Sequence, residues 1–435
     1  MRRLAFAGRS WRELARLGTR LVPGLAAGIA VAVDGLASGG YFPRTWRLTT
    51  IALAALAAAA LFGSRRIALA RRDWAFLALL AALTIWTGLS ARWSGQRTTS
   101  LLEAERDIVY VIAALAIVVA VDRFAIAQIL VGIVAGVTVV CAYGLGRYVF
   151  LGHPLNPIEG KLLFEPLGYA NALGIYAAMG IVVAVGLALA ARDLRLRAAA
   201  LVPLAVLGPT LYLTDSRGAD MALAAGFVVI AVMSGRISRV GAAVLGAAAL
   251  GAVAVVAVVS SSEHGLAARL AGANRPHYWH VAWKEYKLNP VTGSGAGTFD
   301  SYWLHYRPVS SFARDAHSLY VETLAELGPL GLALLVLGLA VPLLGLRKRG
   351  DPLLAAAGAA YVAFVVHAAV DWDWELPAVT VTGLACGAAL LAGSRRADAP
   401  ELGLRGRAAL LAVAVALGVV AIVRLRAGPS LPFSS

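Results

Sequence analysis

Runs of about 18 or more apolar residues recur along almost the whole chain, and no other feature limits its fold as strongly. Of the 435 residues, 60% are hydrophobic, whereas soluble domains are nearer to half apolar. Inside a bilayer every backbone N–H and C=O must bond within the protein, so these runs are expected to be helices. The sequence therefore predicts an all-α polytopic membrane protein that forms a single integral membrane domain over residues 1–435.

The apolar pattern divides the chain into about thirteen predicted spans, which corresponds to 12–13 transmembrane helices. They cover roughly residues 21–38, 48–63, 73–90, 107–121, 125–146, 168–191, 198–213, 217–234, 240–260, 318–346, 353–370, 376–393 and 408–424. The spans that start at 107 and 125 lie close together, which leaves the boundary between them open.

The basic residues predict how these spans are oriented. The first 20 residues contain six arginines, and no cleavable signal peptide is evident in them. This pattern is typical of a retained cytoplasmic tail. With the N-terminus inside, the inner segments hold 23 of the 39 Lys and Arg, as the positive-inside rule requires. We therefore expect a multi-pass protein of the cytoplasmic (inner or plasma) membrane with its C-terminus outside. One long segment, 261–316, is then a large extracytoplasmic loop.

This orientation places the histidines on or near the outer face. They are His153, His264, His277, His280, His305, His317 and His367. ATP and sugar nucleotides are absent outside the cytoplasm, so group transfer there needs a donor that arrives activated, and a membrane suggests a lipid-linked one. A nucleic-acid partner is not expected, because the basic residues that give the net charge of +15 are scattered between spans.

Two polar elements begin predicted spans on the outer side. Tyr169 and Asn171 start one, where the asparagine either bonds a neighbouring helix or contacts a ligand. Arg217 lies in a tight turn, with Ser216 or Asp215 as the candidate helix cap. An arginine at a membrane boundary often just extends toward water. A guanidinium beside a helix N-terminus also favours an anion, which is the interpretation we prefer.

The long loop contains a second arginine, within RPHYWHVAWKEYKL. Arg275, Trp279 and Trp283 recur every four residues, which places them on one face of a helix. We expect this helix to lie at the membrane interface with its aromatic residues facing lipid.

Metal and nucleotide sites are not expected. His277 and His280 are an i, i+3 pair without further ligands, which is weak ground for a metal ion. Cys141 and Cys386 both fall inside apolar runs and predict packing rather than a disulfide or zinc site. The GSGAG sequence at 293–297 lacks the Lys-Ser/Thr of a nucleotide-binding P-loop, so close backbone packing is its expected use.

The sequence DAHSLYVETLAELGPLG, residues 315–331, begins another span. As one helix, residues 317–346 would be about 45 Å long at 1.5 Å per residue, against a hydrocarbon core of about 30 Å. The first third is therefore expected to tilt or rise above the membrane, and Pro329 to kink it. Helical phase turns Glu326 away from His317, so we expect its carboxylate to pair with an arginine rather than orient the histidine. One stripe of this helix holds His317, Tyr320, Leu324, Gly328 and Gly331.

The sequence HAAVDWDWELP, residues 367–377, lies at the outer end of the predicted span 353–370. Its tryptophans are typical of the aromatic belt at a membrane interface, and its acids are typical of a solvated helix end. An acidic and aromatic cluster also suits sugar hydroxyls and sugar faces, with Asp371 as the candidate contact. Both interpretations stay open.

Taken in order, these motifs resemble the O-antigen ligase/polymerase superfamily, which includes bacterial oligosaccharide ligases acting on undecaprenyl-diphosphate donors. The family signature is His, then Asn, Ser or Gln, nine residues, Gly, two residues, and Gly, Thr or Tyr. Here it is matched by His317-Ser318, nine residues, Gly328, two residues and Gly331. The SRG turn, the spacing from Arg275 to Trp279 and the NPVTGSGAGTF and GYAN elements also match. The resemblance covers about 165–395.

The resemblance implies a GT-C-like fold and a metal-independent, cofactor-free glycosyltransferase whose catalytic region is 165–395. The family's catalytic histidine corresponds to His317, and its diphosphate-binding arginines to Arg217 and Arg275, with Arg269 and Arg314 as rivals of the latter. The expected substrate-binding residues are Asn171, Tyr169, Trp279, Glu326, Tyr320, Asp371 and Arg314. The expected partners are an undecaprenyl-diphosphate-linked glycan donor, a glycan, lipid or protein acceptor, and the lipid bilayer.

The physical chemistry agrees with these roles. Two arginines can neutralise the charge that develops on a diphosphate leaving group, and a neutral imidazole can accept the proton of the acceptor hydroxyl. In-line attack would invert the anomeric centre. A polymerase of the same superfamily is an alternative. A transporter of lipid-linked glycans is disfavoured, because inverted repeats are not evident and only Asp34 and His367 suggest ionisable groups deep in the membrane.

Overall fold

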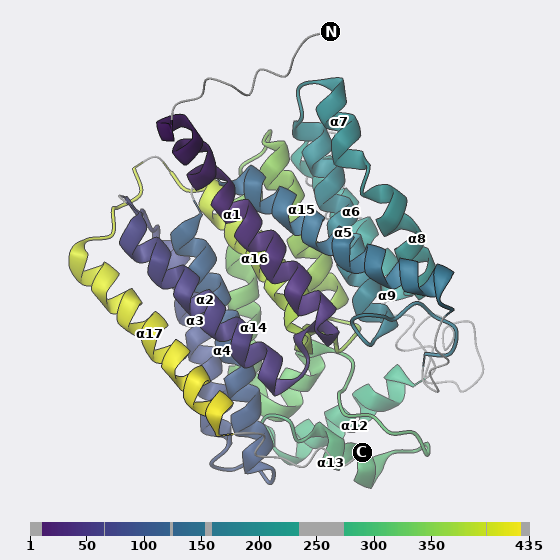
Figure 1. The fold of residues 1–435 in the computed structure, drawn as a ribbon. Helices are drawn as coiled ribbons and strands as arrows, with labels where there is room; N and C mark the ends of the chain where they lie inside the picture. Colours follow the sequence, from purple (N-terminus) through teal and green to yellow (C-terminus); the bar gives the residue numbers. More distant parts are fainter. Residues whose placement is uncertain are drawn as a thin grey trace.

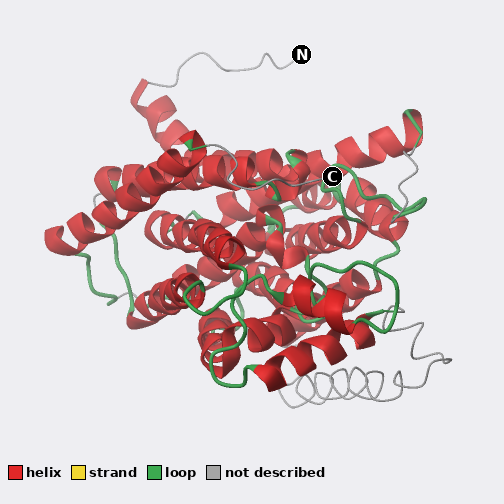
Figure 2. Ribbon diagram, turned by 90° about the horizontal axis from the view of Figure 1, so that it is seen from below, coloured by secondary structure: helices red, strands yellow, loops and turns green. Residues whose placement is uncertain are grey.

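The computed structural model describes residues 11–64, 66–121, 125–152, 159–234, 274–396 and 398–427. Over these ranges the chain is built from helices and their connections, with one isolated β-bridge between Ala68 and Glu401. Figure 2, which looks at the molecule from below, shows helices and loops in all of its coloured parts and no strand. The predicted all-α class is therefore confirmed.

Figure 1 labels the helices, which are numbered in chain order. The first group is α1 (Trp11–Leu36), α2 (Pro43–Gly63), α3 (Arg71–Ser90), α4 (Arg97–Ala120), α5 (Ile126–Phe150), α6 (Ala170–Ala190), α7 (Leu194–Leu201), α8 (Leu204–Thr214) and α9 (Arg217–Met233). The second group is α12 (Arg275–Leu288), α13 (Phe299–Tyr306), α14 (Leu319–Leu343), α15 (Pro352–His367), α16 (Pro377–Gly393) and α17 (Leu404–Arg426). Short 3₁₀ helices are η1 (Ser38–Gly40), η2 (Leu344–Arg347) and η3 (Asp373–Glu375).

Seven segments of the described chain are long and apolar enough to cross a membrane, and three shorter helices are also apolar. The protein is thus a multi-pass membrane protein. Each predicted span within the described residues coincides with a helix or, at 198–213, with the α7–α8 pair, whereas the span at 240–260 lies outside them. The two close spans are separate helices, α4 and α5. Of the predicted tail, residues 1–10 lie outside the described chain and the rest belongs to α1.

The centre of the bundle is formed by the most apolar, small-residue helices. Every residue of α16 is buried, and most of α6 is buried as well. At the edge of the bundle α17 packs along α2 (Figure 1), and α1 packs against α5. A Cβ atom on Gly132 of α5 would lie 2.0 Å from the carbonyl oxygen of Gly24 in α1. Small residues therefore let these helices pack backbone to backbone.

Helices α12 and α13 lie together at one end of the bundle (Figure 1). A second hydrophobic cluster joins them to the start of α14, and it includes Tyr278, Val281 and Trp303. Trp279 packs against this cluster while Trp283 is 50% exposed. The two tryptophans therefore do not share an exposed face, and the prediction that the aromatic residues of α12 all face lipid is wrong, because this helix packs on protein.

The predicted kink of α14 is present, and a glycine provides it. Gly328 has φ 68° and ψ −172° in the middle of the helix, directly before Pro329. A Cβ atom there would lie 2.5 Å from the carbonyl oxygen of Val291. In the facing loop, a Cβ atom on Gly293 would lie 2.2 Å from the carbonyl carbon of Glu326. The GSGAG loop is thus used for close backbone packing against the kink, as predicted.

Candidate functional site

His317 lies in the segment that leads into α14, with its backbone in the left-handed region at φ 53°. Its Nδ1 atom is 3.0 Å from the backbone carbonyl oxygen of Asp315, and its ring stacks on Tyr278 with the centroids 4.7 Å apart. Because a carbonyl only accepts, this contact assigns the proton to Nδ1 and leaves the lone pair on Nε2. Burial lowers the pKa of His317, which favours the neutral imidazole near neutral pH.

Asp371 is the polar hub beside this histidine, and its carboxylate is fully buried. Its Oδ1 accepts hydrogen bonds from the Tyr169 hydroxyl at 2.7 Å and the Trp372 backbone N–H at 2.9 Å. Its Oδ2 accepts from Asn171 Nδ2 and Arg275 Nη2, both at 2.7 Å. Three predicted site residues therefore converge on Asp371. Since both oxygens are occupied, Asp371 is arranged to position these groups rather than to bind a sugar directly.

The charges of this hub are coupled to the histidine. Burial by itself would raise the pKa of Asp371, but the Arg275 guanidinium and the neighbouring His317 imidazole hold it below its ordinary value. Conversely, the Asp371 carboxylate opposes the lowering effect of burial on the pKa of His317. The two predicted catalytic groups, His317 and Arg275, thus share one electrostatic environment.

Arg217 is the first residue of α9, and the turn before it has the predicted cap. The Ser216 hydroxyl accepts the Ala219 backbone N–H at 3.3 Å, and Asp215 adopts φ 47°. The Arg217 side chain is exposed and has no hydrogen bond or ion pair with the described residues. A free guanidinium beside a helix N-terminus is a favourable place for an anion.

The end of α15 brings the starts of α9 and α14 to the same end of the bundle. A Cβ atom on Gly218 would contact His367 and Val370. The Leu319 backbone N–H donates to the Ala368 carbonyl at 2.8 Å. Arg217 and His317, which come just before these two contacts in the chain, therefore flank the end of α15.

A group of ion pairs is buried beneath the histidine. The Arg106 side chain, 1% exposed, donates to Oε1 of Glu375 at 3.0 Å, lies 2.9 Å from its Oε2 as an ion pair, and also pairs with Glu103. Arg314 lies 3.6 Å from Glu103. Although burial alone would raise the pKa of Glu375, Arg106 and Arg314 hold it below its ordinary value. These pairs join α4 to η3 and to the segment before His317.

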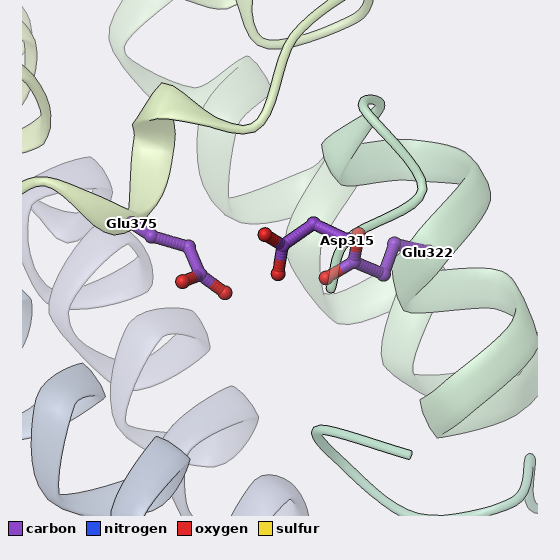
Figure 3. Close-up of side chains that lie close together, drawn as sticks. All are labelled: Asp315, Glu322 and Glu375. Carbon is purple, nitrogen blue, oxygen red and sulfur yellow. The ribbon is translucent and has the colours of Figure 1, made fainter. Parts of the chain in front are cut away.

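Three carboxyl groups meet at the edge of these ion pairs. Asp315, Glu322 and Glu375 have oxygens within 4.8 Å of one another, and Figure 3 shows them pointing toward a common space. Burial raises the pKa of Asp315 well above its ordinary value, which favours the protonated form of this carboxyl group. Carboxylates in this arrangement could also approach one cation, but Arg106 already supplies positive charge at Glu375. The expectation of no metal stays a prediction.

A comparison with protein families tests the resemblance. The family model described as O-antigen ligase matches residues 202–336. This segment contains the SRG turn, Arg275 and the signature from His317 to Gly331. Over this segment the chain is similar to the O-antigen ligase family. No curated protein matches it significantly. The match points to a membrane glycan ligase or polymerase, and it does not reach GYAN or the acidic segment at 371–375.

Among the described residues, Glu326 does not have the arginine partner that the sequence predicted. Its Oε2 accepts the backbone N–H of Gly297 at 2.8 Å and its Oε1 that of Phe299 at 3.0 Å. These donors stand at the start of α13, where helix N–H groups lack partners and negative charge is stabilised. The prediction was wrong because the sequence did not show that the glycine loop folds back onto α14. Glu326 is not arranged as a free substrate ligand.

Three other predicted substrate-binding residues also have protein contacts. Arg314 Nη1 donates to the Tyr41 hydroxyl at 2.7 Å, and the Tyr320 hydroxyl donates to the Val365 carbonyl at 3.0 Å. Trp279 is partly buried in the cluster under α12. Arg314 is thus engaged elsewhere, while its rival Arg269 lies outside the described residues. No comparison tests the substrate contacts of these side chains, which stay predictions.

The sequence analysis missed several groups that support the candidate site. Tyr278, which stacks on His317, lies on the face of α12 that the pattern of arginine and tryptophans did not single out. Arg106 and Glu103 were left outside the span predicted to begin at 107, although α4 begins at Arg97. Ionisable side chains within an otherwise apolar helix indicate a functional site or an ion pair. The chain therefore has more buried ionisable residues in its helices than Asp34 and His367.

Proposed function

We propose that the protein is a metal-independent, inverting membrane glycosyltransferase that moves a glycan from an undecaprenyl-diphosphate-linked donor to an acceptor hydroxyl. The reaction takes place on the outer face of the cytoplasmic membrane, with the N-terminus inside. The family match over residues 202–336 supports the enzyme class. The donor, the orientation and the residue roles are parts of the proposal.

The geometry of His317 carries the proposal. Its Nδ1 is held by the Asp315 carbonyl at 3.0 Å, which leaves Nε2 as a proton acceptor. The ring lies within the electrostatic reach of the Asp371–Arg275 pair. A neutral imidazole beside a fixed guanidinium is the combination that a general-base displacement of a diphosphate requires.

The chemical step follows from these positions. The acceptor O–H gives its proton to Nε2 of His317 while the oxygen attacks C1 of the donor sugar. The bond between C1 and the diphosphate oxygen breaks, and its electron pair leaves with the diphosphate. Arg217 and Arg275 offset the charge that develops on this leaving group. Asp371 keeps the Arg275 guanidinium in place through the 2.7 Å contact.

The test is glycan transfer by the purified protein in detergent or liposomes, with a polyprenyl-diphosphate-linked oligosaccharide as donor. His317→Ala and Arg217→Ala are expected to abolish transfer while the protein still inserts in the membrane. His305→Ala, at an exposed histidine on α13, is the matched control and should remain active. Full activity of either site variant would refute the role assigned to that residue.

The same experiment separates a ligase from a polymerase. A polymerase leaves a ladder of longer glycans on the lipid carrier, whereas a ligase transfers one glycan to a different acceptor. Product length on a gel distinguishes the two outcomes, because both use the same proposed base and arginines.

A further inference from the structure

The segment after α15 contains two buried aspartates, and each has its own basic partner. Asp371 pairs with Arg275 at 2.7 Å. Asp373 lies 3.0 Å from Nδ1 of His367, and both of these side chains are almost completely buried. A buried carboxylate at this distance favours the protonated imidazole. The segment thus holds two neighbouring acid–base pairs, and the sequence resemblance assigns no role to the second.

The free side of His367 is directed at the start of α9. Its Nε2 atom is buried and has no hydrogen-bond partner in the described structure. A Cβ atom on Gly218 would lie 2.9 Å from that nitrogen. Gly218 directly follows Arg217, so the imidazole packs against the first turn of the helix at which the proposed diphosphate binds.

The choice of a histidine here calls for an explanation. A buried ring nitrogen without a partner is unfavourable, and an apolar side chain would fill the space without that cost. An apolar side chain would, however, leave the Asp373 carboxylate unpaired. Histidine is the side chain that fills the space and can also carry the compensating charge.

We propose that His367 is a positioning residue whose imidazolium neutralises Asp373, so that an anionic diphosphate can bind at the Arg217 turn. This inference rests on the proposed function. The charged groups that act on the imidazole are Asp373, Asp371 and Arg275, and the last two already compensate each other. If His367 lost its charge, Asp373 would add one negative charge behind the anion site. Two unit charges about 12 Å apart, at an effective dielectric of about 20, interact strongly enough to change affinity on the order of tenfold.

Binding of farnesyl diphosphate to the purified full-length protein tests the proposal without knowledge of the acceptor. The change in tryptophan fluorescence or equilibrium dialysis gives the Kd. His367→Gln is expected to weaken binding about tenfold, because Asp373 is then unpaired. Asp373→Asn should bind as tightly as the wild type, and the double variant should recover most of the affinity lost in His367→Gln. His305→Gln is the matched histidine control.

Recovery in the double variant distinguishes charge from packing. A double variant as weak as His367→Gln would overturn the proposal, and so would a His367→Gln variant of wild-type affinity. If His367→Gln does not fold, Asp373→Asn alone decides, because a packing role predicts weaker binding and a neutralising role does not. If the wild type fails to bind, or Arg217→Ala binds equally well, the proposed diphosphate site itself is wrong and the inference falls with it. If Arg217→Ala is weak and the His367 variants are unaffected, only the inference is wrong.

Discussion

The Nδ1 atom of His317 lies 3.0 Å from the backbone carbonyl oxygen of Asp315, two residues earlier in the chain. The positive φ of His317 turns the backbone at this residue, where the ring contacts the chain that precedes it. The orienting group of the proposed base is therefore a carbonyl, which cannot titrate. The Asp315 side chain meanwhile belongs to the cluster of three buried carboxyl groups that it forms with Glu322 and Glu375. One residue thus joins the base to the ion pairs beneath it.

Transfer is expected to depend on pH through His317. The base must be neutral, so kcat/KM falls as the pH drops through its pKa. Burial lowers this pKa, which places the midpoint of the acid limb below the ordinary value of about 6.5. Replacing the stacked ring by Tyr278→Leu admits water and should move the midpoint upward. A pH profile of kcat/KM checks both points, and a wild-type midpoint above 6.5 would contradict the assignment.

Replacing Asp371 by asparagine should disable the site while preserving its shape. An asparagine amide would place a donor against the donors of Arg275 or Asn171, and the guanidinium would lose its ion pair. Breaking a buried, hydrogen-bonded charge pair costs about 2–5 kcal/mol, which corresponds to a loss in kcat/KM of about 30-fold or more if it falls on the transition state. Tyr169→Phe removes only one of the four bonds to this carboxylate and serves as the mild comparison. Equal activity of the two variants would argue against Asp371 as the hub.

The apolar periodicity predicted most of the fold. The spans of α2, α3, α5, α6 and α14 to α17 follow from hydrophobicity alone, because a bilayer permits few alternatives to a helix. The start of α4 did not follow, since Glu103 and Arg106 resemble a solvated helix end in the sequence. Their burial depends on Glu375, which is distant in the chain and reaches Arg106 only in the folded bundle.

For the candidate site, the sequence predicted residues but few of the contacts between them. The resemblance predicted His317, Arg217 and Arg275 as site residues, and the structure joins Tyr169, Asn171 and Arg275 through Asp371. Helical phase predicted that Glu326 turns away from the histidine, but it could not reveal the backbone donors of a loop that folds back onto α14. Phase describes one helix, whereas hydrogen-bond partners depend on how several segments pack.

Glu326 is expected to stabilise the loop that leads into α13 rather than to take part in glycan transfer. Glu326→Ala leaves the buried backbone N–H groups of Gly297 and Phe299 without an acceptor, at about 1–3 kcal/mol for each. Glu326→Gln retains one acceptor oxygen and should be less damaging. Thermal unfolding in detergent and limited proteolysis of the loop measure the difference. If both variants unfold like the wild type, the carboxylate does not cap this loop.

Arg106 is expected to be essential for stability. Arg106→Met leaves Glu375 without its ion-pair partner and Glu103 with Arg314 alone, at 3.6 Å. Removing one member of a buried ion pair costs about 3–5 kcal/mol. Adding Glu375→Gln removes one of the stranded charges and should restore part of the loss. Arg97→Met, at an exposed arginine on the same helix, is the control. Melting temperatures compare the four proteins, and a double variant less stable than Arg106→Met would contradict the pairing.

Gly328 offers the sharpest test of how the signature sequence works. Its φ of 68° and ψ of −172° belong to a region that is essentially restricted to glycine, and occupying it costs other residues about 1–3 kcal/mol. A Cβ atom would also lie 2.5 Å from the Val291 carbonyl oxygen, so Gly328→Ala must push the glycine loop off α14. We expect a lower melting temperature and faster proteolysis near residue 291. Gly338→Ala is the matched control in the same helix, because its Cβ would have ordinary contacts no closer than 3.6 Å. If the two alanine variants are equally stable, the glycine at the kink is not required for packing, and the signature would need a different explanation.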